Sequence, residues 1–239
     1  MHSSVIRLVQ GRLAWYAPGG GPPGGAPSGD DAQEAVDAPQ WLDDEDVRQQ
    51  LRAALTQQRS RPRFAAPGGD VRLLRVPVSA AEKKHIAKSL PFMLEEQVVE
   101  DIEGLHFASV PLDKLELGVA VCSREKMLAW RALLEDFPGI QQWVPEQLLL
   151  PWREGEWCVV LEGDDAIVRF DSFGGFSIEC ELLSVMLSGL LAERDEPAAI
   201  ILYGSDQAAD TALIPEPLRD RVQWRRGSLR SAMLLSEPQ

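Results

Sequence analysis

The chain has 239 residues, enough for one large domain or two small ones, and its 45% hydrophobic and 26% charged residues are typical of a globular protein. Its 37 acidic and 24 basic side chains give a formal net charge of −13, which repels phosphate backbones and argues against nucleic-acid binding. Its three cysteines are widely spaced and form no Cys-x-x-Cys pair, so they support neither a disulfide framework nor a zinc site.

The amino-terminal pattern predicts a β-hairpin followed by a loop. Two short apolar runs, residues 5–9 and 12–15, flank Gln10 and Gly11, where a tight turn is expected. Residues 17–39 are rich in glycine, proline and small or acidic side chains, and we predict a mobile loop because they have little apolar surface to bury. No Lys-Ser/Thr pair ends this stretch, so it is not a phosphate-binding P-loop.

Helix and strand signals then alternate. Residues 43–58 predict a helix with an acidic first turn, and residues 71–78 predict a strand. Ser79 and Glu82 form a capping box that begins a second helix. Pro91 interrupts this helix, so we expect a kink or a fresh start there.

The next elements continue the alternation up to a connector. Residues 105–110 and 115–122 are strand candidates, the second with partial alternation. Ser123 caps a helix that Pro138 and Gly139 end. A short strand is expected at residues 140–144.

After residue 151 the pattern restarts with what looks like a three-strand meander, an apolar helix and a wholly apolar strand. An apolar strand that follows a helix is typical of a sheet covered on both faces. A short helix and a last strand complete the series. The predicted elements are residues 157–161, 166–170, 175–178, 179–191, 198–203, 206–213 and 221–224.

The order strand-strand-strand-helix-strand-helix-strand thus occurs twice, with the glycine-rich loop and the first helix as insertions in the first copy. We therefore predict an α/β fold with two ribonuclease-H-like lobes in tandem, the layout of the actin-like ATPase superfamily. The first lobe is expected at residues 1–151, with the loop at residues 17–39, and the second at residues 152–239.

The most distinctive run follows Pro91. We expect residues 92–103 to be helical, with Leu94, Val98 and Ile102 on one face. The acidic residues on this helix are a solvated surface or a docking face for a basic partner, rather than paired catalytic acids, because they lack an opposing wall. Phe92 either belongs to the same surface or fills the core. The acidic residues concerned are Glu95, Glu96, Glu100, Asp101 and Glu103.

Residues 89–108 resemble the signature of the cytoplasmic region of the type II secretion system inner-membrane platform protein L family, GspL. The shared features are Leu-Pro-Phe from residue 90, Glu-Glu-Gln from 95, Asp-Ile-Glu from 101 and Leu-His-Phe from 105. Elsewhere the resemblance is one of layout. It implies a two-lobed actin-like adaptor that docks the N-terminal region of the cytoplasmic secretion ATPase, GspE, and links it to the membrane platform, including GspM.

The resemblance also bears on location and on the docking surface. Family members continue into a transmembrane helix and a small periplasmic domain, so we expect this chain to be the cytoplasmic portion of a single-pass bacterial inner-membrane protein. No signal-peptide core and no run of 18 apolar residues occurs in it. The glycine-rich insertion lies outside the family pattern. The acidic helix, with Phe92, is the expected ATPase-binding surface, and dimerisation is left open.

The actin-like layout raises one alternative, a nucleotide-binding protein of a pilus-assembly platform of the PilM type. That fold holds phosphates with two glycine-bearing hairpins, each led by an aspartate that organises the metal. The first hairpin here, residues 8–12, has no aspartate. The second, residues 161–166, keeps one glycine, and its Asp164 and Asp165 are equally explained as turn residues. We therefore predict no enzymatic activity and no nucleotide or other cofactor.

Histidine and cysteine add no catalytic or metal site to this prediction. His2, His85 and His106 lack metal-ligand spacing. Cys122 and Cys158 lie in apolar strands and are expected to be inert core thiols.

Overall fold

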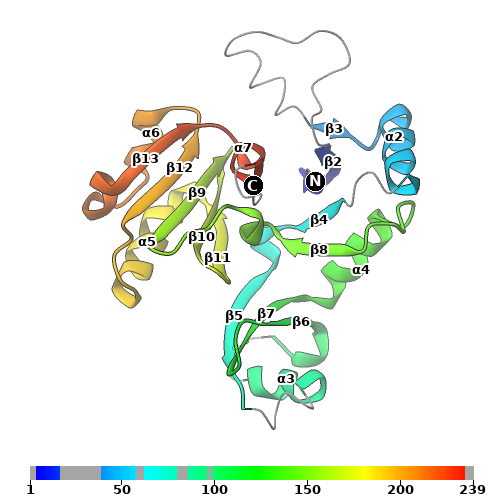
Figure 1. Cartoon of the computed structure of the whole chain (residues 1–239), viewed down its shortest axis with the longest axis horizontal. Coiled ribbons are helices and arrows are strands. Elements are labelled where there is room, and N and C mark those ends of the chain that lie inside the picture. Colours follow the sequence, from blue (N-terminus) through cyan, green and yellow to red (C-terminus); the bar gives the residue numbers. More distant parts are fainter. Residues whose placement is uncertain are drawn as a thin grey trace.

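The computed structural model describes residues 4–16, 39–57, 62–79, 86–95, 98 and 100–234. Two five-stranded sheets lie on either side of the molecule, and a three-stranded sheet extends from between them (Figure 1). The loop predicted at residues 17–39 and the helix start predicted after Ser79 fall almost entirely outside the described residues.

The first sheet begins with the predicted hairpin, which is confirmed. Strands β1 and β2 pair antiparallel around Gln10 and Gly11, whose φ angles of 49° and 77° are both left-handed. This two-residue turn matches the twist of the strands, and glycine adopts it without strain. The strands, in the order β3-β2-β1-β4-β8, are β3 (Gln40–Trp41), β2 (Arg12–Tyr16), β1 (Val5–Val9), β4 (Arg63–Ala66) and β8 (Gln142–Pro145).

Two of these strands, β3 and β4, were not predicted, because two and four residues are too few to show a period. The pairs β1–β4 and β4–β8 are parallel. Helix α2 (Glu45–Thr56) is capped by Asp44, whose side chain accepts from the backbone N–H of Asp46 at 2.8 Å. It connects β3 to β4, so the expectation that the first helix is an insertion is wrong: it is a crossover of the first lobe.

The second sheet repeats this arrangement. An antiparallel meander, β11-β10-β9, continues into two parallel strands. Two sheets of the same order confirm the predicted fold class, α/β with tandem ribonuclease-H-like lobes. The strands are β11 (Gly174–Glu179), β10 (Asp165–Asp171), β9 (Glu156–Glu162), β12 (Ala199–Gly204) and β13 (Val222–Arg226), and the helices are α5 (Cys180–Glu193) and α6 (Gln207–Ala212).

A separate unit is inserted between β4 and α4 (Arg124–Leu133), and sequence patterns alone did not separate it from the first lobe. It consists of a sheet in the order β5-β7-β6 and helix α3, and we call it the inserted unit. Its own core includes Leu90, Leu94 and Val119, all almost fully buried. The elements are β5 (Arg72–Pro77), α3 (Ile86–Leu94), β6 (Leu105–Pro111) and β7 (Glu116–Ser123).

Helix α3 decides between the two alternatives expected at Pro91 only in part. It continues through Pro91 to Leu94, so the fresh start expected as one alternative does not occur. The expected helix over residues 92–103 is wrong beyond Leu94: the chain bends, and a short 3-10 helix, η3 (Ile102–Gly104), follows. Adjacent valines and acidic residues one turn apart oppose a helix here. The start of β6 at Leu105 also requires the chain to turn back.

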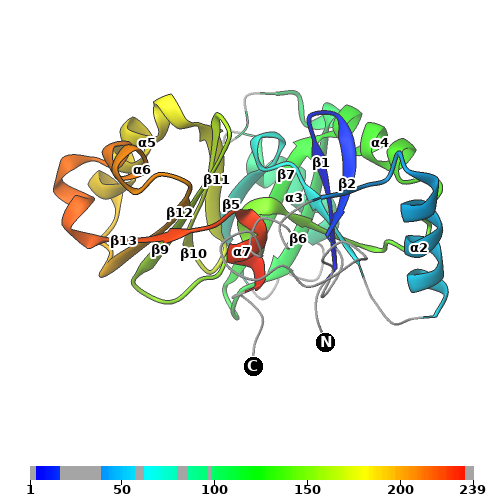
Figure 2. The ribbon, with the colours of Figure 1, turned by 90° about the horizontal axis from the view of Figure 1, so that it is seen from above.

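The two lobes are joined by a shared apolar core. It combines Val5 and Ala65 of the first sheet with Val160 and Tyr203 of the second. Helix α7 (Leu229–Leu234), which follows β13, adds Leu229 to this core and lies between the lobes (Figure 2). No helix among the described residues has both the length and the apolar character needed to cross a membrane.

Candidate functional site

The predicted docking residues lie on the inserted unit, on α3 (Figure 1) and on the segment that leads from α3 back to β6, and we call residues 92–95 and 100–103 the docking segment. Phe92 is 68% exposed, so it does not fill the core, and Glu95 is exposed directly after the helix ends. A large exposed aromatic side chain beside carboxylates is the kind of residue that anchors protein interfaces. Glu96 lies outside the described residues.

The remaining three predicted residues are placed on the return segment rather than on the helix. Glu100, Asp101 and Glu103 are all exposed. Asp101 also has a structural role, because its Oδ1 accepts from the backbone N–H of Glu103 at 3.0 Å and so caps η3. The acids are thus carried by two elements rather than by one helical face. Because Leu105 pairs with Ser123, the residue before α4, the return segment leads to the end of the inserted unit nearest the lobes.

The docking segment rests on the core of the inserted unit. Leu94, at the end of α3, and Leu105, at the start of β6, are buried in the core of the inserted unit, and Val98 between them packs against it. The backbone N–H of Val98 donates to the carbonyl of Leu94 at 3.1 Å. The exposed side chains are thus carried by a segment that apolar contacts hold at both ends.

A cleft of about 910 Å³ lies between the two lobes, where the actin-like layout would place a nucleotide. Both hairpins that were compared with phosphate-binding loops line it, and Gly163 has the left-handed φ of 63° that its turn requires. The lining is acidic, so its field repels a polyphosphate. The charged residues of the lining are Arg7, Asp70, Glu146, Glu162, Asp164, Asp165 and Glu179.

The basic residue in this lining, Arg7, is already paired with two carboxylates. Its Nε donates to Glu146 Oε1 at 2.9 Å, and its Nη2 lies 2.7 Å from Glu162 Oε2. Burial by itself lowers the pKa of Arg7, but the charges of Glu146 and Glu162 outweigh that effect and hold the pKa well above its ordinary range. These three residues, which we call the cleft triad, link β1 to the second lobe.

Close backbone approach completes the contact between the lobes. The N–H of Gly68 donates to Glu146 Oε2 at 3.1 Å, and its carbonyl accepts from Gln147 at 3.0 Å. A Cβ at position 68 would lie 1.9 Å from Ser177 Oγ, so only glycine fits there without movement. Neither Gly68 nor the cleft triad was found from the sequence. The available signal was Arg7 itself, a charged residue inside an apolar strand.

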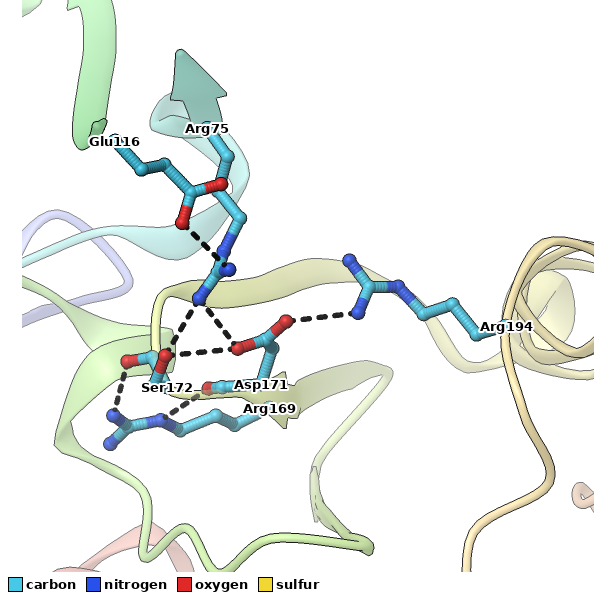
Figure 3. A network of polar contacts seen from close by, with 6 residues as sticks. All are labelled: Arg75, Glu116, Arg169, Asp171, Ser172 and Arg194. Atoms are coloured by element: carbon cyan, nitrogen blue, oxygen red, sulfur yellow. Dashed lines mark hydrogen bonds and ion pairs between the residues drawn. The ribbon is translucent and has the colours of Figure 1, made fainter. Parts of the chain in front are cut away.

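A second polar network holds the inserted unit to the second lobe (Figure 3). Arg75 of β5 donates to Glu116 of β7 at 3.0 Å and to Asp171, at the end of β10, at 2.9 Å. Arg194, after α5, donates to the other oxygen of Asp171 at 2.9 Å. Burial raises the pKa of Asp171. The hydrogen bonds from Arg194 and Ser172 and the charge of Arg75 together lower it by more, so the net shift of the pKa is downward.

Arg169 lies next to this network, and its side chain donates hydrogen bonds to backbone carbonyl groups. Its guanidinium donates to the carbonyls of Leu148 and Leu150, at 2.8 and 2.6 Å, and to that of Ser172 at 2.7 Å. The first two carbonyls belong to the segment between the lobes, so Arg169 ties that segment to β10. Like Arg7, it is a charged residue in an otherwise apolar strand, Ala-Ile-Val-Arg-Phe.

The thiols and histidines form no reactive cluster in the described part of the chain. Cys158 is buried between the lobes, and burial raises its pKa to about 12, which makes the thiol unreactive at neutral pH. Cys122 is also buried, and its pKa is raised by burial and by Asp70. Among the described residues, no three His, Cys, Asp or Glu side chains are close enough together to hold a metal ion.

Comparison with known proteins identifies a family whose members include a solved structure of similar fold. Residues 41–235 match the family model for type II secretion system protein L. The protein of that name from Klebsiella pneumoniae is 30% identical over 158 residues, and that from Dickeya chrysanthemi is 28% identical over 159 residues. Each alignment covers 66% of this chain and 39% of the relative, so the chain spans about two fifths of these curated relatives.

Two solved structures are similar over nearly the whole chain. One is the cytoplasmic domain of EpsL, an inner-membrane component of the type II secretion system of Vibrio cholerae, with a TM-score of 0.65 and 16% identity over 99% of this chain and 95% of that one. The other is a Bacteroides thetaiotaomicron protein with an actin-like ATPase fold, with a TM-score of 0.50 and 12% identity over 98% and 96%. At these identities the likeness establishes the fold alone.

Proposed function

Because the chain belongs to the type II secretion system protein L family, we propose that it is a non-catalytic adaptor of that system, which docks the secretion ATPase, GspE, to the inner-membrane platform. In this proposal GspM and other platform proteins are the further partners, and the chain lies on the cytoplasmic side of the inner membrane. The solved EpsL cytoplasmic domain, which shares this fold, supports that location.

The exposed docking segment of the inserted unit is the observation that carries the docking proposal. Phe92 presents a large apolar side chain to solvent, and four exposed carboxylates follow it in the sequence, at Glu95, Glu100, Asp101 and Glu103. Desolvating one such apolar side chain contributes about 1.5–3 kcal/mol to binding, and the carboxylates favour encounter with a basic partner surface. The docking segment therefore supplies an apolar anchor and a charged rim.

Co-elution tests this proposal. The chain is mixed with the N-terminal region of the secretion ATPase from the same organism and analysed by size exclusion with light scattering, which also reports any homodimer. We expect a complex of defined mass. Phe92→Ala and the double variant Glu100→Lys/Glu103→Lys should each weaken it at least tenfold, through loss of the anchor and reversal of the rim.

Matched controls separate the docking segment from general effects of charge and apolar loss. Leu128→Ala removes an exposed apolar side chain of α4, and Glu154→Lys/Asp220→Lys reverses two exposed acids of the second lobe. Both controls should leave the complex unchanged. Unaltered affinity in the two docking-segment variants would remove this surface from the docking proposal, and absence of any complex with the wild-type chain would remove docking itself.

The acidic lining of the cleft argues against the nucleotide-binding alternative. A bound polyphosphate would meet Asp164, Asp165 and Glu179, while the guanidinium of Arg7 is already held by Glu146 and Glu162. Titration with magnesium–ATP, followed by tryptophan fluorescence, is expected to show no saturable change at millimolar concentration. A saturable change with micromolar midpoint would favour the actin-like nucleotide-binding protein instead.

A further inference from the structure

Strand β6 forms one edge of the three-stranded sheet, and no described strand lies beyond it. Its residues are almost all exposed after Leu105, and Val110 keeps 45% of its surface. The strand has seven residues and contains no Asp, Glu, Lys or Arg, although a quarter of the whole chain is charged. A long, uncharged edge is one that another strand can join.

The hydrogen-bond register shows which backbone groups of β6 point outward. The N–H of Leu112 donates to the carbonyl of Glu116 at 3.1 Å, in the same register that pairs His106 with Cys122. Hydrogen-bonded pairs alternate along an antiparallel ladder, so the even-numbered residues bond to β7. The N–H and C=O groups of Phe107 and Ser109 therefore point away from the sheet.

Strand β6 offers a longer unprotected edge than the other described edge strands. Strand β3 has two residues, β8 has four and ends in a proline, and β5 carries two arginines and a terminal proline. Strand β13 ends in Arg225 and Arg226, and β11 lies against the loop after β4, where Ser177 meets Gly68. Short length, charge, proline and cover are the ways in which proteins prevent edge pairing. Strand β6 also ends in a proline, Pro111, but the six residues before it contain neither a charge nor a proline.

Charge indicates what kind of strand fits this edge. Glu100, Asp101 and Glu103 are exposed just before β6, and Asp113 lies just after it. Antiparallel pairing of two copies would bring Glu103 of one copy near Asp113 of the other. Parallel pairing would place the three acids of one copy beside the same three acids of the other. Like charges across paired strands are destabilising. A second copy of this net-negative chain is therefore disfavoured.

We propose that the outer edge of β6 is a strand-addition site for an extended segment of another protein, with lysine or arginine at the end that lies beside Glu100, Asp101 and Glu103. Backbone bonds to Phe107 and Ser109 supply the pairing, and the three acids set the orientation. This inference goes beyond the proposed function, because it does not require the segment to come from the ATPase.

The test uses the full chain and two labelled nine-residue peptides of alternating valine and threonine, with two arginines at the amino or the carboxyl end. Fluorescence anisotropy measures binding. Ser109→Pro removes an outward N–H without breaking a bond to β7, and Pro111 already occupies an equivalent outward position in the same strand. We expect Ser109→Pro to weaken binding of the better peptide at least tenfold, and Ser109→Ala, which keeps the N–H, to change it less than twofold.

Amide hydrogen exchange gives a second measurement that needs no variant. The amides of Phe107 and Ser109 should exchange fast in the unbound chain and at least tenfold more slowly with saturating peptide, while those of His106 and Ala108 are protected in both. Equal binding by Ser109→Pro and Ser109→Ala, unchanged exchange at Phe107 and Ser109, or no binding at millimolar peptide would overturn the proposal. A wild-type dimer that Ser109→Pro abolishes would overturn it too, because the occupant would be a second copy.

Co-elution with the ATPase fragment distinguishes this inference from the proposed function. If Ser109→Pro loses the peptide but keeps the ATPase, the edge is a site for another partner and both proposals stand. If Phe92→Ala loses the ATPase while the peptide fails to bind wild-type chain, the docking proposal stands and strand addition is refuted.

Discussion

The cleft between the lobes and the docking segment of the inserted unit are both rich in carboxylates, but the two regions use them in opposite ways. In the cleft, Glu146 is buried and shares Arg7 with Glu162. In the docking segment, Glu100 and Glu103 are exposed beside a backbone edge that no described strand covers. Burial and pairing convert carboxylates into structural links, whereas exposure leaves them available to a partner.

The same contrast fits the scaffold role proposed above. The cleft triad and the apolar core around Val160 and Tyr203 join the two lobes directly. Asp171 and its arginine partners hold the inserted unit to the second lobe. In the docking proposal, the lobes are the base and the inserted unit carries the recognition surface.

The largest effect is expected from breaking the cleft triad. Arg7→Met leaves Glu146 buried without its counter-charge, which typically costs about 3–5 kcal/mol of unfolding free energy. Urea denaturation measures it, as a lower midpoint with unchanged slope.

Arg12→Met is the matched control for this change. Arg12 lies in the same hairpin, but its pairing with Asp43 is exposed, so we expect a loss of about 1 kcal/mol or less. A loss for Arg7→Met no larger than the loss for Arg12→Met would show that the triad does not hold the lobes.

A smaller and pH-dependent effect is expected at Asp171, which joins the inserted unit to the second lobe. Asp171→Asn removes the charge that Arg75 and Arg194 share, at a cost of about 1–2 kcal/mol at pH 7. The pKa of Asp171 is lowered by folding, so its contribution is complete above its unfolded pKa of about 3.9 and is lost as pH falls through the folded value.

The difference in stability between wild type and Asp171→Asn should therefore be constant from pH 7 to about pH 5 and shrink below about pH 4. Denaturant titrations across that range measure it. A difference that grows on acidification would contradict the assigned role of the Asp171 carboxylate.

The sequence predicted the fold class because periodic elements such as the hairpin at Gln10-Gly11 and the helix capped by Ser123 carry local signals. It did not reveal β4 or the inserted unit, because strand pairing over long separations, such as β1 with β4, has no local pattern. The same limit applies to the cleft triad, whose members Arg7 and Glu146 are 139 residues apart.

At the candidate site, the sequence predicted which residues are exposed better than it predicted the elements that carry them. The acidic residues and Phe92 were identified from their run in the sequence, and five of the six are described and exposed. Their placement on one helix was wrong, because Leu94, Val98 and Leu105 share one core and bend the chain between α3 and β6. The edge of β6 has no positive signal in the sequence, only an absence of charge.

The smallest stability effect is expected at Phe92, and it sharpens the comparison because a buried residue lies two positions away on the same helix. Phe92→Ser removes a side chain that is 68% exposed, so unfolding free energy should change by less than about 0.5 kcal/mol. Leu94→Ala, at a fully buried position, should cost about 2–5 kcal/mol. Thermal and urea unfolding of both variants measure the pair. A loss above about 1 kcal/mol for Phe92→Ser would mean that the ring supports the core, and the docking segment would then lose the anchor on which the docking proposal depends.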